Sequence, residues 1–190
     1  MTPEDLKALI RTVPDFPKPG ILFRDITTLI GHGPGLAAAT RMLAEQASAA
    51  GAQAIAGIEA RGFIFGAAVA VQLGLGFLPV RKPGKLPVPV LALDYALEYG
   101  TDTLEIDPGA IPPGQRVVLI DDLIATGGTA LAAAQLLRKA GARVEHALFV
   151  IDLPDLGGAD RLRAAGIAVE MRAPDGEPAD DSDRRGRESR

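Results

Sequence analysis

The chain has 190 residues, a formal net charge of −4 and no cysteine. This length suits one domain that removes roughly 70% of its unfolded surface from water on folding. The lack of cysteine excludes disulfides, thiolate catalysis and cysteine-bound zinc, and two histidines are too few for an all-histidine metal site. Basic residues are scattered, so nucleic acid is not an expected partner. The polar N-terminus lacks the apolar core of a secretory signal, which predicts a cytoplasmic protein.

The N-terminal part of the chain predicts a short helix followed by an irregular connection. Thr2 and Pro3 suit an N-cap and a first helical position, and apolar residues at helical spacing continue to Val13. Prolines and a glycine within 14–20 then force an extended connection. Residues 21–23, Ile-Leu-Phe, suit a strand or an ordered loop.

From residue 36 onward, helical and strand patterns alternate. The expected helices span 36–50, 63–73, 128–140 and 159–165, and the expected strands span 54–58, 77–80, 116–121, 144–151 and 167–171. Such alternation predicts an α/β fold in which right-handed crossovers build a parallel sheet.

Three segments need separate treatment. Residues 62–80 carry no charge over nineteen residues, which is long enough for a membrane span. Glycines and a proline divide them into a helix and a strand, so no membrane association is expected. Proline-rich residues 82–90 make a poor helix and a poor central strand, whereas 95–106 could form a short hairpin. The polar, charged composition of 173–190 predicts a disordered tail.

The most informative segment is V-V-L-I-D-D-L-I-A-T-G-G-T at 117–129. A buried strand would deliver Asp121 and Asp122 to the sheet edge where ligands of α/β proteins bind. The segment then continues into a loop whose glycines let backbone N–H groups approach a phosphate at a helix N-terminus. The loop residues in question are Ala125, Thr126, Gly127, Gly128 and Thr129.

The two carboxylates of this segment would repel the same phosphate. They must therefore face hydroxyl donors of a ribose or a divalent cation. An ordinary glycine turn with an acidic helix cap is the alternative, but the strand, acid pair, loop and helix in one register favour a site for a phosphorylated sugar. Neither the Walker A pattern nor G-x-G-x-x-G occurs in the chain, which argues against a nucleotide triphosphatase and a dinucleotide site.

Together with four other segments, this motif resembles the type I phosphoribosyltransferase family, and within it the enzymes of adenine salvage. The five segments are P-D-F-P-K-P-G-I-L-F-R-D-I-T (14–27), E-A-R-G-F-I-F-G (59–66), R-K-P-G-K-L-P (81–87), L-E-Y-G-T-D-T-L-E-I (97–106) and the motif at 117–129. The resemblance implies a single domain over 1–172 with a central twisted parallel sheet flanked by helices. It also implies a small hood from about 1–33 and a flexible lid at about 82–100.

The implied reaction transfers phosphoribose from 5-phosphoribosyl-1-pyrophosphate (PRPP) to N9 of adenine, giving AMP and pyrophosphate with Mg²⁺. Breaking the C1–O bond creates a cationic sugar and a multiply charged leaving group, so placed cations are needed more than a nucleophile. The resemblance assigns that role to Arg61, Arg81, Lys82 and Lys85, with Arg81 able to reach a neighbouring subunit of a homodimer. Mg²⁺ is expected to bind through PRPP or pyrophosphate, with Asp121 or Asp122 contacting it through water at most.

The base site is implied by the same resemblance. Phe23 would stack on adenine, and backbone groups around Arg24 and Ile26 would bind its edge. Glu98 would handle the proton at N7, and Tyr99 would help to close the lid. Without the resemblance, Phe23 is equally an ordinary core aromatic, Glu98 a surface carboxylate, and Lys82 and Lys85 part of a solvated loop.

Two other functions share part of this pattern. A phosphoribosyltransferase for another purine base would share the 117–129 motif but not the F-R-D-I-T and L-E-Y-G segments. A regulatory protein that senses PRPP on the same fold should carry a basic DNA-binding module, and the residues that precede the first expected strand of the parallel sheet include no basic recognition helix.

Overall fold

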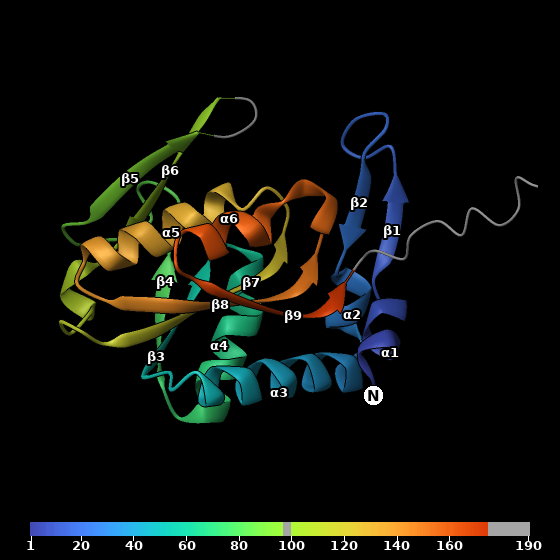
Figure 1. The fold of residues 1–190 in the computed structure, drawn as a ribbon, viewed down its shortest axis with the longest axis horizontal. Helices are drawn as coiled ribbons and strands as arrows, with labels where there is room; N and C mark the ends of the chain where they lie inside the picture. Colours follow the sequence, from blue (N-terminus) through green and yellow to red (C-terminus); the bar gives the residue numbers. More distant parts are fainter. Residues whose placement is uncertain (97–99, 175–190) are drawn as a thin grey trace, which may run out of the picture.

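The structure, a computed structural model, describes residues 1–96 and 100–174. Its centre is a parallel sheet of five strands in the order β4-β3-β7-β8-β9 (Figure 1). The strands are β3 (Ala54–Ile58), β4 (Gly76–Val80), β7 (Arg116–Ile124), β8 (Arg143–Asp152) and β9 (Ala168–Pro174). The expected α/β fold with a central parallel sheet is confirmed.

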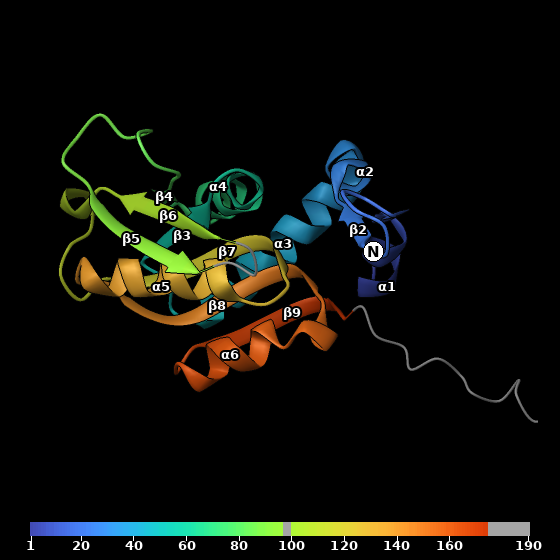
Figure 2. The same ribbon diagram turned by 90° about the horizontal axis from the view of Figure 1, so that it is seen from above.

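Helices cover both faces of this sheet (Figure 2). On one face lie α3 (Gly33–Ala49) and α4 (Arg61–Leu73), and on the other α5 (Gly128–Lys139) and α6 (Gly158–Ala164). The side chains of β7 alternate between the two faces, so Val117 and Leu119 join the core under α5, whereas Val118 and Ile120 join the core under α3 and α4. This burial on both faces explains the continuous apolar runs in the sequence.

The N-terminal segment folds beside the β9 edge of the sheet (Figure 1). It comprises α1 (Pro3–Ala8), β1 (Arg11–Pro14), β2 (Leu22–Asp25) and α2 (Thr27–Gly31). The helix expected to reach Val13 is wrong, because the chain leaves the helix at Leu9 and Val13 pairs with Phe23 in an antiparallel ladder. The helix expected at 36–50 begins earlier, at Gly33, because the His32 side chain accepts a hydrogen bond from Gly35 N at 3.1 Å.

The excursion between β4 and β7 contains the antiparallel strands β5 (Leu91–Ala96) and β6 (Thr101–Ile106). A hairpin was expected at 95–106, but β5 begins four residues earlier, because Leu91 already pairs with Ile106. Residues 62–80 form α4 and β4 rather than one long helix. Within the described residues, no helix combines the length and apolar character needed to cross a lipid bilayer. Short 3-10 turns follow β6 (Pro108–Ala110) and β8 (Pro154–Leu156).

Two strands run past their expected ends. β7 continues to Ile124 instead of ending at Asp121, because Asp121 and Leu123 still pair with Phe149 and Ile151 of β8. β9 extends to Pro174, so the first two residues of the expected tail belong to the sheet. The rest of that tail, 175–190, lies outside the described residues.

Candidate active site

A cleft opens at the carboxyl ends of the neighbouring strands β3 and β7. It has a volume of about 270 Å³ and is lined by residues 58–61 and 121–130. Ligands of α/β sheets gather at this edge. The cleft brings together Arg61, the pair Asp121 and Asp122, and the whole of the predicted phosphate loop 125–129.

The phosphate loop is shaped by a left-handed glycine and by close backbone packing. Gly127 has φ 74°, a conformation that L side chains rarely adopt, and α5 begins at the next residue. A Cβ on Gly158 would lie 2.2 Å from the Ala125 carbonyl oxygen and 2.7 Å from Gly127 N. The start of α6 is therefore the surface on which the loop rests.

Arg161 adds a cation that the sequence did not point to. Its guanidinium Nη1 lies 3.6 Å from the place where a Cβ on Gly128 would be. The loop 125–129 has no basic residue of its own, so its attraction for an anion rests on backbone N–H groups, hydroxyls and the dipole of α5. Arg161 brings a full positive charge to the same place from α6.

The acid pair is tightly enclosed. Asp122 is only 2% exposed, and its Oδ2 lies 2.9 Å from Arg61 Nε in an ion pair. Within the described part of the chain Oδ2 accepts no hydrogen bond, so its contact with Arg61 is an ion pair without hydrogen-bond geometry. Burial raises the pKa of Asp122, against the opposing charge of Arg61. Burial and the charge of Asp122 raise the pKa of Asp121 well above its ordinary value.

This pair is suited to groups that donate hydrogen bonds or carry positive charge. Asp121 Oδ1 already accepts from Asp122 N at 2.9 Å, and a Cβ on Gly62 would lie 2.8 Å from the same oxygen. Glycine at the second position of α4 thus allows that helix to begin against the acid pair. Burial disfavours the ionised form of both carboxyl groups. Ribose hydroxyls or a cation beside the remaining carboxylate oxygens would stabilise that ionised form.

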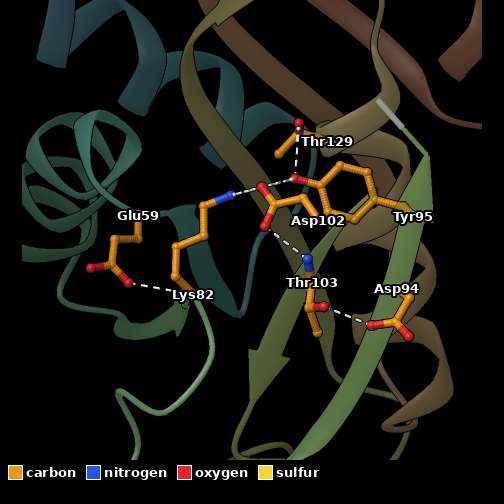
Figure 3. Close-up of polar contacts among 7 residues, drawn as sticks. All are labelled: Glu59, Lys82, Asp94, Tyr95, Asp102, Thr103 and Thr129. Atoms are coloured by element: carbon orange, nitrogen blue, oxygen red, sulfur yellow. Dashed lines mark hydrogen bonds and ion pairs between the residues drawn. The ribbon is translucent and has the colours of Figure 1, made fainter. Parts of the chain in front are cut away.

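Glu59 anchors the cationic segment that follows β4. Its carboxylate accepts a hydrogen bond from Lys82 N at 3.0 Å (Figure 3). It also accepts from Arg81 Nε and Nη2 at 3.3 and 3.4 Å. The backbone donor of Lys82, followed by Arg81, lowers the pKa of Glu59. Arg81 also donates to the Lys85 carbonyl at 3.1 Å. Sequence reasoning missed Glu59, although it directly precedes the A-R-G of the cleft.

Of the predicted cations, only Arg61 lines the cleft itself. Arg81 and Lys82 lie beside it, because Glu59 is a lining residue and holds both. Lys85 is exposed on the loop after β4. The structure thus gathers three of the four predicted cations around one carboxylate and the cleft.

The predicted base site adjoins the cleft through an aromatic contact. The guanidinium carbon of Arg61 lies 5.8 Å from the Phe23 ring centroid, and the Phe16 ring meets Phe23 edge-on at 5.1 Å. Phe23 is only half-buried rather than part of the core. The Arg24 side chain bonds to Thr12, and Ile26 is 3% exposed and belongs to the core under α3 and α4.

The two predicted residues Glu98 and Tyr99 lie outside the described residues. Among the residues that the structure does describe, no three histidine or acidic side chains are gathered as a metal site would require. Two adjacent carboxylates fit a hard cation such as Mg²⁺ by their chemistry, but that ion takes six oxygen ligands. Most of its ligands would have to come from water or from a bound phosphate.

Replacing Asp121 with asparagine is expected to stabilise the fold increasingly as the pH rises. Because the folded-state pKa of Asp121 is raised above 3.8, the native state holds a proton that the unfolded chain releases. The stability that this carboxyl contributes is fully present below about pH 4 and is lost as the pH rises through its folded pKa. The Tm of D121N should therefore exceed that of the wild type by a difference that grows from pH 4 to pH 8.

The matched control is Asp155→Asn, which changes the same charge on an exposed turn. Its Tm should follow that of the wild type at every pH. A Tm difference between D121N and the wild type that stays constant from pH 4 to pH 8 would contradict the raised pKa of Asp121.

The comparisons with known proteins agree with this site. Residues 27–172 match the family model described as phosphoribosyl transferase domain. The chain is 75% identical to an adenine phosphoribosyltransferase of Novosphingobium aromaticivorans over 170 residues, which cover 90% of this chain and 96% of the relative. A solved adenine phosphoribosyltransferase of Thermoanaerobacter pseudethanolicus superposes with a TM-score of 0.86 at 46% identity, covering 91% and 99% of the two chains.

A more distant solved relative carries a ligand. The Saccharomyces cerevisiae adenine phosphoribosyltransferase, complexed with an imino-altritol bisphosphate and adenine, superposes with a TM-score of 0.84 at 36% identity, covering 89% and 97% of the two chains. A family model that matches most of this chain, and relatives matched over nearly their whole length, agree with each other and with the cleft. The chain therefore belongs to the adenine phosphoribosyltransferase family.

Proposed function

We propose that this chain transfers 5-phosphoribose from PRPP to N9 of adenine, giving AMP and releasing pyrophosphate. The observation that carries the proposal is the cleft itself. It combines a glycine loop suited to a phosphate, an acid pair suited to ribose hydroxyls and the cation Arg61, and these three features match the 5-phosphate, the ribose and the pyrophosphate of PRPP. The contact between Arg61 and Phe23 brings a half-buried aromatic ring to the same edge.

The donor half of the reaction needs no covalent nucleophile. N9 attacks C1 as the C1–O bond breaks, and the bonding electrons leave with pyrophosphate. We infer that the loop 125–129 binds the 5-phosphate and that Asp121 and Asp122 accept hydrogen bonds from the ribose hydroxyls. Arg61, with Arg81, Lys82 and Lys85, would stabilise the charge that develops on pyrophosphate.

The acceptor half depends on residues from the hood (1–33) and the lid (82–100). Phe23 stacks on adenine in this proposal, while the backbone around Arg24 and Ile26 binds its edge. Glu98 takes the proton at N7, whose loss prevents a positive charge from remaining on the base after N9 has bonded to C1. Tyr99 helps to close the lid, which excludes water from a cationic sugar that water would otherwise attack.

Mg²⁺ is the proposed cofactor. The acid pair fits this ion by the chemistry of its carboxylate oxygens, and the ion's other ligands would come from PRPP or pyrophosphate. When bound, Mg²⁺ neutralises part of the leaving group's charge. Asp121 and Asp122 would hold it through water, while continuing to orient the ribose.

We further propose that the protein works as a homodimer in the cytoplasm, as the family resemblance implies. The family arginine that matches Arg81 can reach a neighbouring subunit's site. Arg81 here binds Glu59 of its own chain. In a dimer it would have to release Glu59 in order to reach the neighbouring subunit's site.

The test is an assay of purified protein with Mg²⁺, PRPP and each purine base. Adenine should be converted to AMP, whereas hypoxanthine and guanine should give no nucleotide. Conversion of all three bases at similar rates would replace the adenine assignment with a general purine activity. The lack of any AMP at saturating PRPP and adenine would sink the proposal.

A further inference from the structure

A chain of hydrogen bonds connects the β5–β6 hairpin to Thr129 of the cleft and to Lys82 beside it. Thr129 Oγ1 lies 3.2 Å from the Tyr95 hydroxyl, which lies 3.1 Å from Asp102 Oδ2. The Lys82 ammonium bonds to the same Asp102 oxygen and lies 3.5 Å from the Tyr95 hydroxyl. Figure 3 shows these four side chains pointing toward one another, with Thr129 reaching in from α5.

The direction of each hydrogen follows from the chemistry of the groups. An ionised carboxylate only accepts and an ammonium only donates, so Lys82 and Tyr95 both donate to Asp102. The Tyr95 hydroxyl has then used its single hydrogen, and Thr129 must donate its own to Tyr95. The Asp102 carboxylate therefore accepts from two donors directly and, through Tyr95, sets the direction of the Thr129 hydrogen.

The protonation states support this assignment. Burial lowers the pKa of Lys82, but the hydrogen bond to Asp102 and the negative charge of that carboxylate outweigh it, and the pKa is raised. The hydrogen bond from Lys82 lowers the pKa of Asp102. Asp102 Oδ1 also accepts from Thr103 N at 2.8 Å, which fixes the carboxylate on β6. Lys82 and Asp102 are thus charged near neutral pH, and the carboxylate is held in place.

Two of these donors are the groups that PRPP needs. Thr129 belongs to the loop proposed to bind the 5-phosphate, and Lys82 belongs to the cations proposed for pyrophosphate. In the described structure Lys82 donates a hydrogen to the Asp102 carboxylate, and Thr129 donates its hydrogen to the Tyr95 hydroxyl that this carboxylate orients. We propose that Asp102, together with Tyr95, is a positioning residue that competes with PRPP and pyrophosphate for Lys82 and Thr129.

The competition is weak enough to be reversible. The side chains of Lys82 and Asp102 are 37% and 29% exposed, and partly solvated pairs of this kind are easily exchanged. PRPP would take both donors on binding, and Asp102 would recover them as pyrophosphate leaves. The role of Asp102 in this inference, which rests on the proposed function, is to limit the affinity for pyrophosphate and so help product release.

The test is to replace Asp102 with asparagine and measure the binding of Mg²⁺-pyrophosphate and of PRPP by calorimetry. Because the competing anion is removed, both Kd values should fall by about two- to fivefold, the range expected for a partly exposed ion pair. The KM for PRPP should fall with them, and kcat should stay level or decrease as pyrophosphate leaves more slowly. A residue that only stabilised the hairpin would give the opposite, a higher KM.

The chain offers a closely matched control in Asp94→Asn. Asp94 lies on β5 of the same hairpin and accepts from Thr103 Oγ1 at 2.6 Å, so D94N removes the same charge without touching Lys82 or Thr129. It should leave both Kd values unchanged. In a K82Q background most of the gain from D102N should disappear, because the effect acts mainly through Lys82.

Tyr95→Phe provides a second variant if D102N does not fold. It removes the hydroxyl that accepts from Thr129, and should also tighten PRPP binding, by a smaller factor. Unchanged or weaker binding in every folded variant would overturn the inference. If the wild type itself failed to bind PRPP, the proposed function would fail, whereas PRPP binding without tightening in D102N would reject only the role of Asp102.

Discussion

Replacing Glu98 with glutamine is expected to lower kcat by about 10²–10⁴-fold, the usual contribution of a positioned acid–base group. Glutamine keeps the size and polarity of the side chain but does not take up a proton at neutral pH. Adenine would then keep its N7 proton as N9 bonds to C1, and the transition state would carry more positive charge on the base. Steady-state rates with adenine at saturating PRPP measure the loss.

The loss should be confined to the chemical step. Because PRPP is proposed to bind in the cleft and Glu98 to act on adenine, the Kd of PRPP by calorimetry should change less than about twofold, well below the change in kcat. Glu45→Gln, the same substitution on the exposed side of α3, should leave both quantities as in the wild type. Parallel losses in kcat and PRPP affinity would argue that Glu98 maintains the site rather than transfers a proton.

Replacing Gly158 with alanine is expected to raise the KM for PRPP by roughly tenfold or more. The added Cβ would lie 2.2 Å from the Ala125 carbonyl oxygen and 2.7 Å from Gly127 N. Both are backbone atoms of the phosphate loop, so the loop has to move, and displacements of about 1 Å in a binding site can cost up to 10²-fold. The G158A substitution is thus expected to weaken PRPP binding by displacing the phosphate loop and not by contacting the substrate.

Ribose 5-phosphate separates this effect from general damage. It carries the 5-phosphate but no pyrophosphate, so its affinity should fall in G158A, whereas that of Mg²⁺-pyrophosphate should be largely retained. Gly33→Ala is the control, because a Cβ there meets nothing within 4 Å. Wild-type affinity for ribose 5-phosphate in G158A would contradict the packing argument, and a Tm measured alongside separates a moved loop from an unfolded protein.

Strands that are buried on both faces were the part of the fold most accessible from sequence. β3 spans the predicted residues Ala54–Ile58 because five small or apolar residues bounded by polar ones have no other stable environment. β1 could not be found in this way. Its residues continue a helical pattern, and only the pairing of Val13 with Phe23, ten residues away, makes the strand the better solution.

The residues of the candidate site also differ in whether they could be predicted from the sequence. The phosphate loop and acid pair were predictable because they are consecutive residues whose backbone demands and charges can be read together. Arg61 was predicted because residues 59–66 resemble a segment of the family, and physical reasoning alone did not single it out. Glu59, Gly158, Arg161 and Asp102 were missed, since nothing near them in sequence marks them as different from other acidic, small or basic residues.

The sequence by itself determined the alternation of strands and helices and predicted a glycine-containing loop and an acid pair suited to a phosphorylated sugar. Each of these depends on periodicity, turn residues or charges within about a dozen positions. Only the tertiary structure decided which groups from separate elements meet in and beside the cleft. Lys82 meets Asp102, Arg161 approaches Gly128, and Gly158 supports Ala125, because the parallel sheet and its hairpin bring their elements together. Such contacts depend on where separate elements pack, and that is set by burial of the whole core rather than by any one segment.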